Sequence, residues 1–338
     1  MKTTLNKIGK NSLLLAVLLV FAFFAAFLLC VFIGVSNVSV SDALKALFGL
    51  DSSSSAYRII VHVRLPRALA AALSGMALAV SGVIIQAVLN NALASPNIIG
   101  VNAGAGLAVV ALVSLFPSAL SVAPFAAFFG ALLTTSLIYL IASRTGAGRV
   151  TIALIGVAVN SLLTACMNAF KTIFPETLYN ANSFLMGGIS GVSLQKLNPA
   201  WIIIVIFCAV AFVLGKDIDV LALGEHTAQS LGMNVRMMRM ILIVVASALA
   251  GAAVSFAGLL SFVGLIVPHI ARRFSHGSHR TLIFYSAFGG ACFVMICDIL
   301  SRILFAPYEI PVGIIMSFVG APFFIYLILK KRRGRIYD

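Results

Sequence analysis

The sequence predicts an all-α membrane protein with ten transmembrane helices, a short eighth helix and both termini in the cytoplasm. Of its 338 residues, 62% are hydrophobic and only 9% are charged, and the mean hydropathy is +1.13. A soluble domain usually carries about a quarter charged residues, so this composition excludes a water-soluble globular protein. The net charge of +14 comes from short basic segments between apolar runs. That is the pattern of cytoplasmic loops under the positive-inside rule, not of a nucleic-acid-binding face.

The apolar runs follow one another with only short polar segments between them, so residues 1–338 are predicted to form a single transmembrane domain. A helix needs about 20 apolar residues to cross the hydrocarbon core. Lys2, Lys7 and Lys10 precede the first run, which is longer than the apolar region of about 7–15 residues in a signal peptide. It is therefore interpreted as the first span, with its N-terminus inside. The predicted spans are residues 12–35, 64–89, 98–115, 125–142, 150–170, 199–214, 241–256, 259–269, 281–304 and 310–329.

Two features support the second span. Pro66 lies in its first turn, where the missing N–H has no partner to lose. Ala71, Gly75 and Ala79 recur every four residues, which gives a small-residue face that lets another helix approach closely. Residues 36–63, before this span, are predicted to form an external loop with a short helix over 42–48.

Turn signals mark two later connections. Ser95 and Pro96 look like an N-cap followed by proline, just before the third span. Residues 171–198 are interpreted as an amphipathic external stretch, and the glycines at 187, 188 and 191 predict a bend within it.

Residues 241–270 constrain the topology. Arg236 and Arg239 precede this apolar run and Arg272 and Arg273 follow it, so both ends should be cytoplasmic and the run must cross an even number of times. One helix of this length would span about 45 Å, against a core of about 30 Å. A full seventh span and a short eighth satisfy both facts. Irregular backbone between them is tolerated only inside protein or beside water, which makes this place a candidate for the permeation path or its gate.

The segment Leu221–Val235 is neither strongly apolar nor basic. Glu225, His226 and Gln229 would be desolvated without partners in hydrocarbon, so the segment is placed outside the membrane. A short ordered helix is predicted here, with Gly232 closing it as a C-terminal cap. We interpret it as a cytoplasmic handle gripped by another protein; an ordinary interhelical loop is the alternative.

No residue set points to catalysis. The pairs Gly9-Lys10 and Gly215-Lys216 lack the glycine frame of a phosphate-binding loop, so the chain is not expected to hydrolyse ATP. The five cysteines and five histidines are scattered, and neither a metal site nor a cofactor is predicted. His269, at the end of the short eighth span, is interpreted as a helix-terminus or packing residue.

Few charges fall within the spans. Asp298 and Arg302 are four residues apart near the outer end of the ninth span and can form a pair, and Glu309 begins the tenth. A carrier coupled to protons or sodium ions would need charges nearer the membrane midplane. Their scarcity favours energy supplied by another protein. An ion-coupled secondary transporter is kept as the alternative of another class.

Three arginines lie on the external side, where positive charge is normally depleted: Arg58, Arg64 and Arg302. Snorkelling or local ion pairing would explain them. The functional alternative is that they dock carboxylates of an external partner, since the planar guanidinium binds a carboxylate through two hydrogen bonds.

Taken together, these features resemble the permease subunits of the iron-siderophore and cobalamin class of ABC importers, the FecCD type. The resemblance covers almost the whole chain from Arg64 to Leu329. The matching stretches are RLPRALAAALSGMALAVSGVIIQ (64–86), NNALASPNIIGVNAGAG (90–106), MGG (186–188), ALGEHTAQSLGM (222–233), GLLSFVGLIVPHIARR (258–273) and EIPVGIIMSFVGAPFFIYLI (309–328).

The resemblance implies a multi-pass protein of the bacterial cytoplasmic membrane that pairs with a second permease subunit, either a sibling or an identical copy. It also implies two partner ATPase subunits that use ATP, and an extracytoplasmic binding protein that delivers the ligand. Nucleic acid is not a partner. The implied cargo is a ferric siderophore of the hydroxamate or catecholate type, with cobalamin or haem as alternatives.

Site residues follow from the resemblance at matching positions. Arg64 and Arg302 match positions that engage glutamates on the two lobes of the binding protein, whereas Arg58 lies near a third such arginine but out of register. The residues implied to couple the chain to the ATPase are Leu223, Gly224, Glu225, His226, Ala228, Ser230, Leu231, Gly232 and Met233.

Overall fold

The computed structural model describes residues 2–34, 36, 38–47, 50, 53–144, 149–275 and 277–334, and all its regular elements are helices. The ten longer apolar helices are α1 (Lys2–Phe32), α4 (Leu65–Leu89), α5 (Val101–Leu115), α6 (Ala123–Arg144), α7 (Arg149–Ile173), α10 (Ala200–Val213), α13 (Val235–Ala257), α14 (Val263–Arg272), α15 (His279–Ile303) and α16 (Val312–Gly334). The shorter elements are α2 (Val40–Leu47), α3 (Ser55–Ile59), η1 (Ile60–Arg64), η2 (Pro96–Ile99), η3 (Pro117–Val122), α8 (Thr177–Met186), α9 (Leu194–Leu197), α11 (Gly215–Ala222) and α12 (Glu225–Ser230).

Each of the ten predicted spans overlaps one of the longer helices. Within the described residues, seven helical stretches are long and apolar enough to cross a membrane, and α5, α14 and Val312–Leu327 of α16 are shorter apolar helices. The all-helical membrane architecture is therefore confirmed. That all three shorter helices complete a crossing, giving ten in total, stays a prediction.

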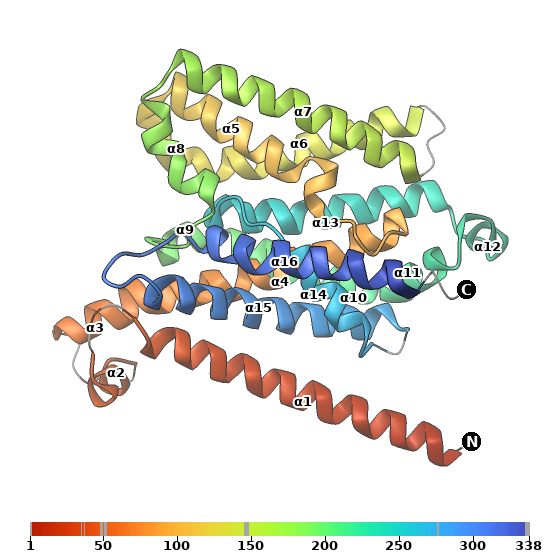
Figure 1. The fold of residues 1–338 in the computed structure, drawn as a ribbon, viewed down its shortest axis with the longest axis horizontal. Coiled ribbons are helices and arrows are strands. Elements are labelled where there is room, and N and C mark those ends of the chain that lie inside the picture. Colours follow the sequence, from red (N-terminus) through yellow and green to blue (C-terminus); the bar gives the residue numbers. More distant parts are fainter. Residues whose placement is uncertain are drawn as a thin grey trace.

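The core of the molecule lies around α4 and α13. In the most apolar stretch of each of these helices 83% of the residues are buried, against 17% in α1 and 11% in α7. Figure 1 shows α5, α6 and α7 grouped on one side of α13, while α1 lies at the opposite edge beside α15. The helices that cross at the centre are thus shielded by more exposed ones around them.

Glycines allow a close crossing of α4 and α15. A Cβ added to Gly75 of α4 would overlap the backbone of Gly290 in α15, and one added to Gly290 would overlap the carbonyl oxygen of Gly75 and the Cβ of Ala79. The predicted small-residue face of the second span is confirmed, because it is the surface on which α15 packs. Close approach of backbones supplies the van der Waals contact that holds helices together in a membrane.

The second span begins earlier than predicted. Ser54 caps α3, its hydroxyl accepting from the N–H of Tyr57 at 3.1 Å, and the helix continues through the π-helical turn η1 into α4. The prediction of a loop up to residue 63 was wrong there, since the apolar residues after Ser54 extend the helix outward. The short helix predicted over 42–48 is confirmed as α2, which begins two residues earlier and ends at Leu47.

Left-handed glycines shape the other connections. The third span starts at Val101, later than predicted, because Pro96–Ile99 forms a 3-10 turn closed by Gly100 at φ +86°. The predicted bend after α8 is confirmed, with Gly187 at φ +73° and Gly191 at φ +74°.

The break between α13 and α14 is also confirmed. Gly258 at φ +70° ends α13, and Phe262 takes the left-handed φ of +68°, which is unfavourable for a residue with a side chain. The Phe262 ring packs against Gly320 of α16, where a Cβ would overlap it. With ten residues, α14 is about 15 Å long, half of a hydrocarbon core of about 30 Å.

The two ends of the molecule differ. The start of α1, the end of α16 and α12 lie at one end, whereas α2 and α3 lie at the other (Figure 1). That the start of α1, the end of α16 and the handle lie at the same end of the molecule agrees with the predicted topology. The assignment of that end to the cytoplasm stays a prediction.

We expect Gly290→Ala to lower the free energy of unfolding of the purified chain by about 1–3 kcal/mol, and so to lower its melting temperature, because the added methyl group overpacks the crossing with α4. Gly289→Ala is the matched control: its Cβ would meet only Cγ1 of Val267 at 3.4 Å. Both changes gain the same helix propensity. Thermal unfolding in one detergent would compare them, and equal melting temperatures would contradict the packing role assigned to Gly290.

Candidate functional site

The handle folds as predicted. Gly224 at φ +111° separates α11 from α12, and Gly232 at φ +85° ends α12. The Gly232 N–H donates to the Gln229 carbonyl at 2.9 Å, and the Met233 N–H donates to the Ala228 carbonyl at 3.0 Å. This pair of bonds is a Schellman motif, so the short helix and its glycine cap are both confirmed.

The surface of the handle is unusual for a water-facing loop. Leu223 and Leu231, at the two ends of α12, are each 63% exposed, whereas Ala228 is fully buried beneath them. The side chains of His226 and Ser230 are also exposed. Two large apolar groups on an ordered, polar turn form a surface suited to contact with another protein.

Polar contacts hold α12 to the start of α13. The Glu225 carboxylate accepts from the Arg239 guanidinium at 2.9 Å, and the Arg239 side chain is buried. Asn234 caps α13 by accepting from the Met237 N–H at 3.0 Å. The Tyr139 hydroxyl of α6 donates to the Arg236 carbonyl at 2.8 Å. These contacts surround a cavity of about 360 Å³ between α6, α12 and α13.

The preceding helix α11 is held to α15 by contacts that sequence reasoning missed. Asp219 accepts from the backbone N–H of His279 at 2.8 Å and pairs with its Nδ1 at 2.6 Å. Ser278, the N-cap of α15, makes no side-chain capping bond, so Asp219 supplies that cap from another helix. Arg280 lies 5.7 Å from the ring centroid of Phe212 and donates to the Val213 carbonyl at 3.1 Å. Asp219 and His279 are 60 residues apart in the chain, and no local sequence pattern indicates that they meet.

A second polar cluster lies at the opposite end of the molecule. Asp298 is fully buried, pairs with Arg302 one turn on, and accepts from Nε of Arg67 at 2.9 Å. Arg67 also pairs with Glu309 at 2.7 Å. The predicted Asp298–Arg302 pair is confirmed. Arg67 was missed, although a buried arginine in the first turn of an apolar helix requires a carboxylate partner.

The three external arginines have different environments. Arg64 is 4% exposed and donates to the carbonyls of Val31 and Phe32, while Arg302 is 2% exposed and donates to those of Cys30 and Ile33. Both therefore bind the carbonyls that end α1. Arg58, on α3, is exposed. The internal contacts of Arg64 and Arg302 agree with the local-pairing explanation for these two arginines, and their docking role stays a prediction.

A cavity of about 530 Å³ lies at the break between α13 and α14, the place predicted as a candidate path or gate. Its walls come from the end of α8, the segment 259–261 and the first turns of α16. The Leu259 N–H donates to the Phe184 carbonyl, and the Gly313 N–H to the Gly187 carbonyl, each at 2.9 Å. The last turn of α8 is thus bonded to the break, and Gly187 directly after α8 is bonded to α16.

Comparisons with known proteins point in one direction. Residues 18–330 match the FecCD transport family. The chain is 37% identical to the Fe(3+)-citrate import system permease protein YfmE of Bacillus subtilis over 98% of its own length and 99% of that protein. It is 34% identical to the hemin transport system permease protein HmuU of Yersinia pestis, covering 94% and 97% of the two chains. A solved inward-facing structure of a metal-chelate type ABC transporter superposes with a TM-score of 0.83 at 26% identity, covering 94% of this chain and 99% of that one.

We expect Arg302→Ala to destabilise the chain by about 3–5 kcal/mol, because it removes one partner of a buried ion pair and two donors to the end of α1. Arg58→Ala is the control, since Arg58 is exposed. Thermal unfolding followed by size-exclusion chromatography would measure both. A melting temperature of Arg302→Ala equal to that of Arg58→Ala would show that the cluster does not hold α1.

Proposed function

Because this chain belongs to the FecCD transport family and is thereby a permease subunit of an ABC importer in a bacterial membrane, we propose that it moves a ferric siderophore inward. Support for this cargo comes from relatives named for Fe(3+)-citrate and iron(3+)-hydroxamate import, each at least 35% identical. Haem is an alternative cargo, because the chain is also similar to the hemin permease of Yersinia pestis. Cobalamin is the third cargo that the family resemblance allows.

The chain is not an enzyme, and ATP is hydrolysed by a separate ATPase. We propose that one partner ATPase binds the handle around α12 of this chain, with Leu223 and Leu231 filling an apolar groove on the ATPase surface. The observation that carries this proposal is the pair of exposed leucines on a helix that is itself firmly attached. A few well-packed apolar side chains commonly supply most of the binding energy at a protein interface.

The contacts of the handle suggest how its movement reaches the membrane. The Glu225–Arg239 pair joins α12 to α13, which ends at the break beside the 530 Å³ cavity. Asp219 joins α11 to α15, which packs along α4. Displacement of the handle would therefore act on two helices at once. This is the basis on which we propose alternating access driven by closure of the ATPases.

The proposed path runs beside α7. The side chains of Ser161, Thr164, Asn168 and Thr172 are exposed and fall on one face of this little-buried helix. Polar groups that face lipid would lose their hydrogen bonds to water and find no replacement. This face is therefore better placed along a water-filled path between two subunits. A second permease subunit would complete the path. Bacillus subtilis has two Fe(3+)-citrate permeases related to this chain, which fits a sibling pair, although an identical copy would serve equally.

An external binding protein is proposed to deliver the ligand. Arg58 is the docking arginine whose charge is directly available, on the short helix α3 at the end opposite the handle. Arg64 and Arg302 could engage carboxylates of that partner only by giving up carbonyls at the end of α1. Docking through them would thus be coupled to release of α1.

An ion-coupled carrier is the rival mechanism. Its strongest candidate residue is Asp298, the fully buried carboxylate in the apolar region. That carboxylate is already paired with two arginines, Arg67 and Arg302. Each carboxylate oxygen of Asp298 pairs with a guanidinium group of the chain itself, so a transported cation would have to displace an arginine to bind there.

Reconstitution in liposomes tests the function. With the second permease subunit, the ATPases and the ligand-loaded binding protein, we expect accumulation of ferric siderophore that requires ATP hydrolysis. The chain alone, under a proton or sodium gradient, should accumulate none. Accumulation by the chain alone would establish the rival, and a ligand other than a ferric siderophore on the purified binding protein would replace the proposed cargo.

Gly232→Arg tests the handle. We expect it to reduce ATP-driven uptake at least about tenfold, as loss of an interface hot spot does, while membrane insertion is kept. Gly277→Arg is a matched control: both glycines have φ +85° and no atom within 4 Å of an added Cβ. The positive φ and the free space are therefore matched, but Gly277 lies between α14 and α15. Equal uptake by the two variants would remove the handle from the coupling mechanism.

A further inference from the structure

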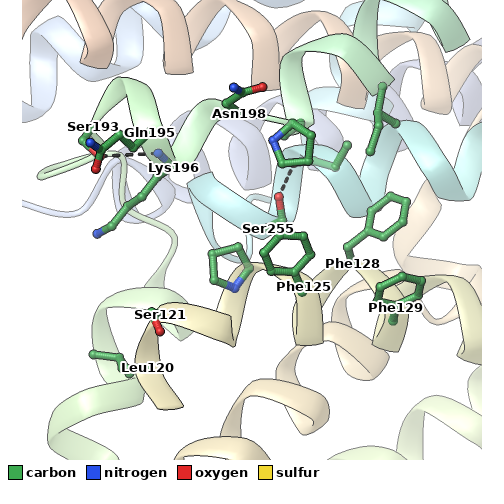
Figure 2. Close-up of a pocket in the computed structure, with 15 residues that line it drawn as sticks. Leu120, Ser121, Phe125, Phe128, Phe129, Ser193, Gln195, Lys196, Asn198 and Ser255 are labelled. Atoms are coloured by element: carbon green, nitrogen blue, oxygen red, sulfur yellow. Dashed lines mark hydrogen bonds between the residues drawn. The ribbon is translucent and has the colours of Figure 1, made fainter. Parts of the chain in front are cut away.

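A cleft of about 450 Å³ lies between the starts of α6 and α10 and the last turns of α13 (Figure 2). It is at the end of the molecule away from the handle, since α13 runs from the handle towards it. None of the contacts described for coupling, for the external ion cluster or for the cavity at the break involves its walls. The cleft therefore needs its own explanation.

The walls change character along the cleft. Figure 2 shows Lys196, Gln195 and Ser193 at one side, on α9 and the residue before it, and Phe128 and Phe129 of α6 at the other. Because α6 starts at Ala123 near this end and runs towards the handle end, the phenylalanines lie deeper than η3 and the start of α6. An amphiphile with one polar end and one apolar end matches this gradient.

The charge of the cleft indicates which charge the polar end of that amphiphile carries. Among the described residues that line the cleft, Lys196 is the only charged one, and its side chain is exposed. The Ser255 hydroxyl on the α13 wall donates to the Ala252 carbonyl at 2.8 Å and so does not need a ligand. An ammonium group at the rim and no carboxylate in the walls favour an anionic group at the membrane surface.

We propose that this cleft binds one anionic phospholipid of the outer leaflet, with its phosphate beside Lys196 and an acyl chain along Phe125, Phe128 and Phe129. The aromatic wall does not suit a water-soluble iron chelate. Three helices border the cleft, and α6 and α10 both pack on α13. A lipid held there would connect the outer ends of α6 and α10 beside the helix that carries the coupling contact with Glu225.

The single tryptophan of the chain makes a direct test possible. In a Trp201→Phe background, Phe129→Trp places the sole indole in the cleft of the full-length chain. Leu133→Trp is the matched reporter: Leu133 is one turn further along α6, 70% exposed and not part of the cleft. Each protein is placed in phosphatidylcholine bilayers, and quenching by brominated phosphatidylglycerol is compared with quenching by brominated phosphatidylcholine.

At position 129 we expect quenching that saturates at a low fraction of brominated phosphatidylglycerol, and at position 133 no preference between the lipids. Lys196→Gln should reduce the preference at 129 about fivefold, the effect of one lysine charge near an anionic surface. Lys45→Gln, on exposed α2, should leave it unchanged. Equal quenching by both lipids at 129, or an unchanged preference in Lys196→Gln, would overturn the proposal.

A second measurement covers failure of the tryptophan variants to fold. Native mass spectrometry of the wild-type chain and of Lys196→Gln, each purified in detergent with added phosphatidylglycerol, counts retained lipids. One fewer bound lipid in Lys196→Gln than in wild type and Lys45→Gln supports the site. The same number in all three overturns it.

Discussion

The Asp298 carboxylate lies fully buried between Arg67 and Arg302, and much of the half of the molecule opposite the handle depends on this arrangement. Hydrocarbon offers no hydrogen-bond partner, so a charge near the membrane must be paired inside the protein. The pair fixes α15 against α4, Arg67 extends the contact to Glu309 before α16, and Arg302 reaches the end of α1. One buried carboxylate thus links four membrane helices.

The same constraint explains the irregular backbone. The break after α13 would be costly against lipid. Here its Leu259 N–H donates to the Phe184 carbonyl in the last turn of α8, and the left-handed Phe262 packs its ring on Gly320. The backbone groups that leave the helix find partners on neighbouring segments. A break of this kind can persist beside a cavity, which is why the short helix α14 and the cavity occur together.

At the other end the molecule combines rigid attachment with an exposed surface. The buried side chain of Arg239 and the cap from Asp219 hold the handle to α13 and α15, while Leu223 and Leu231 remain uncovered. If the handle moved independently of α13 and α15, a displacement caused by a partner would not be transmitted to these helices. Attachment on one side and exposure on the other are what the proposed coupling role of the handle requires.

The sequence by itself determined the class of protein, the approximate position of every long helix, the short helix at Glu225–Ser230 and its Gly232 cap. These follow from hydropathy, loop charge and local backbone preference, which act over a few neighbouring residues. The Asp298–Arg302 pair was also predictable, because residues four apart share a helix face.

Only the tertiary structure decided which partners Arg58, Arg64 and Arg302 have. It also decided that Asp219 caps a helix that begins 60 residues later. It buried Arg64 and Arg302 against the end of α1 and left Arg58 exposed, a distinction invisible in a list of external charges. The physical reason is that the packing of whole helices decides which charged side chains meet. Helix packing in lipid depends on close backbone contacts such as that of Gly75 with Gly290. Such contacts bring together segments that are far apart in the chain.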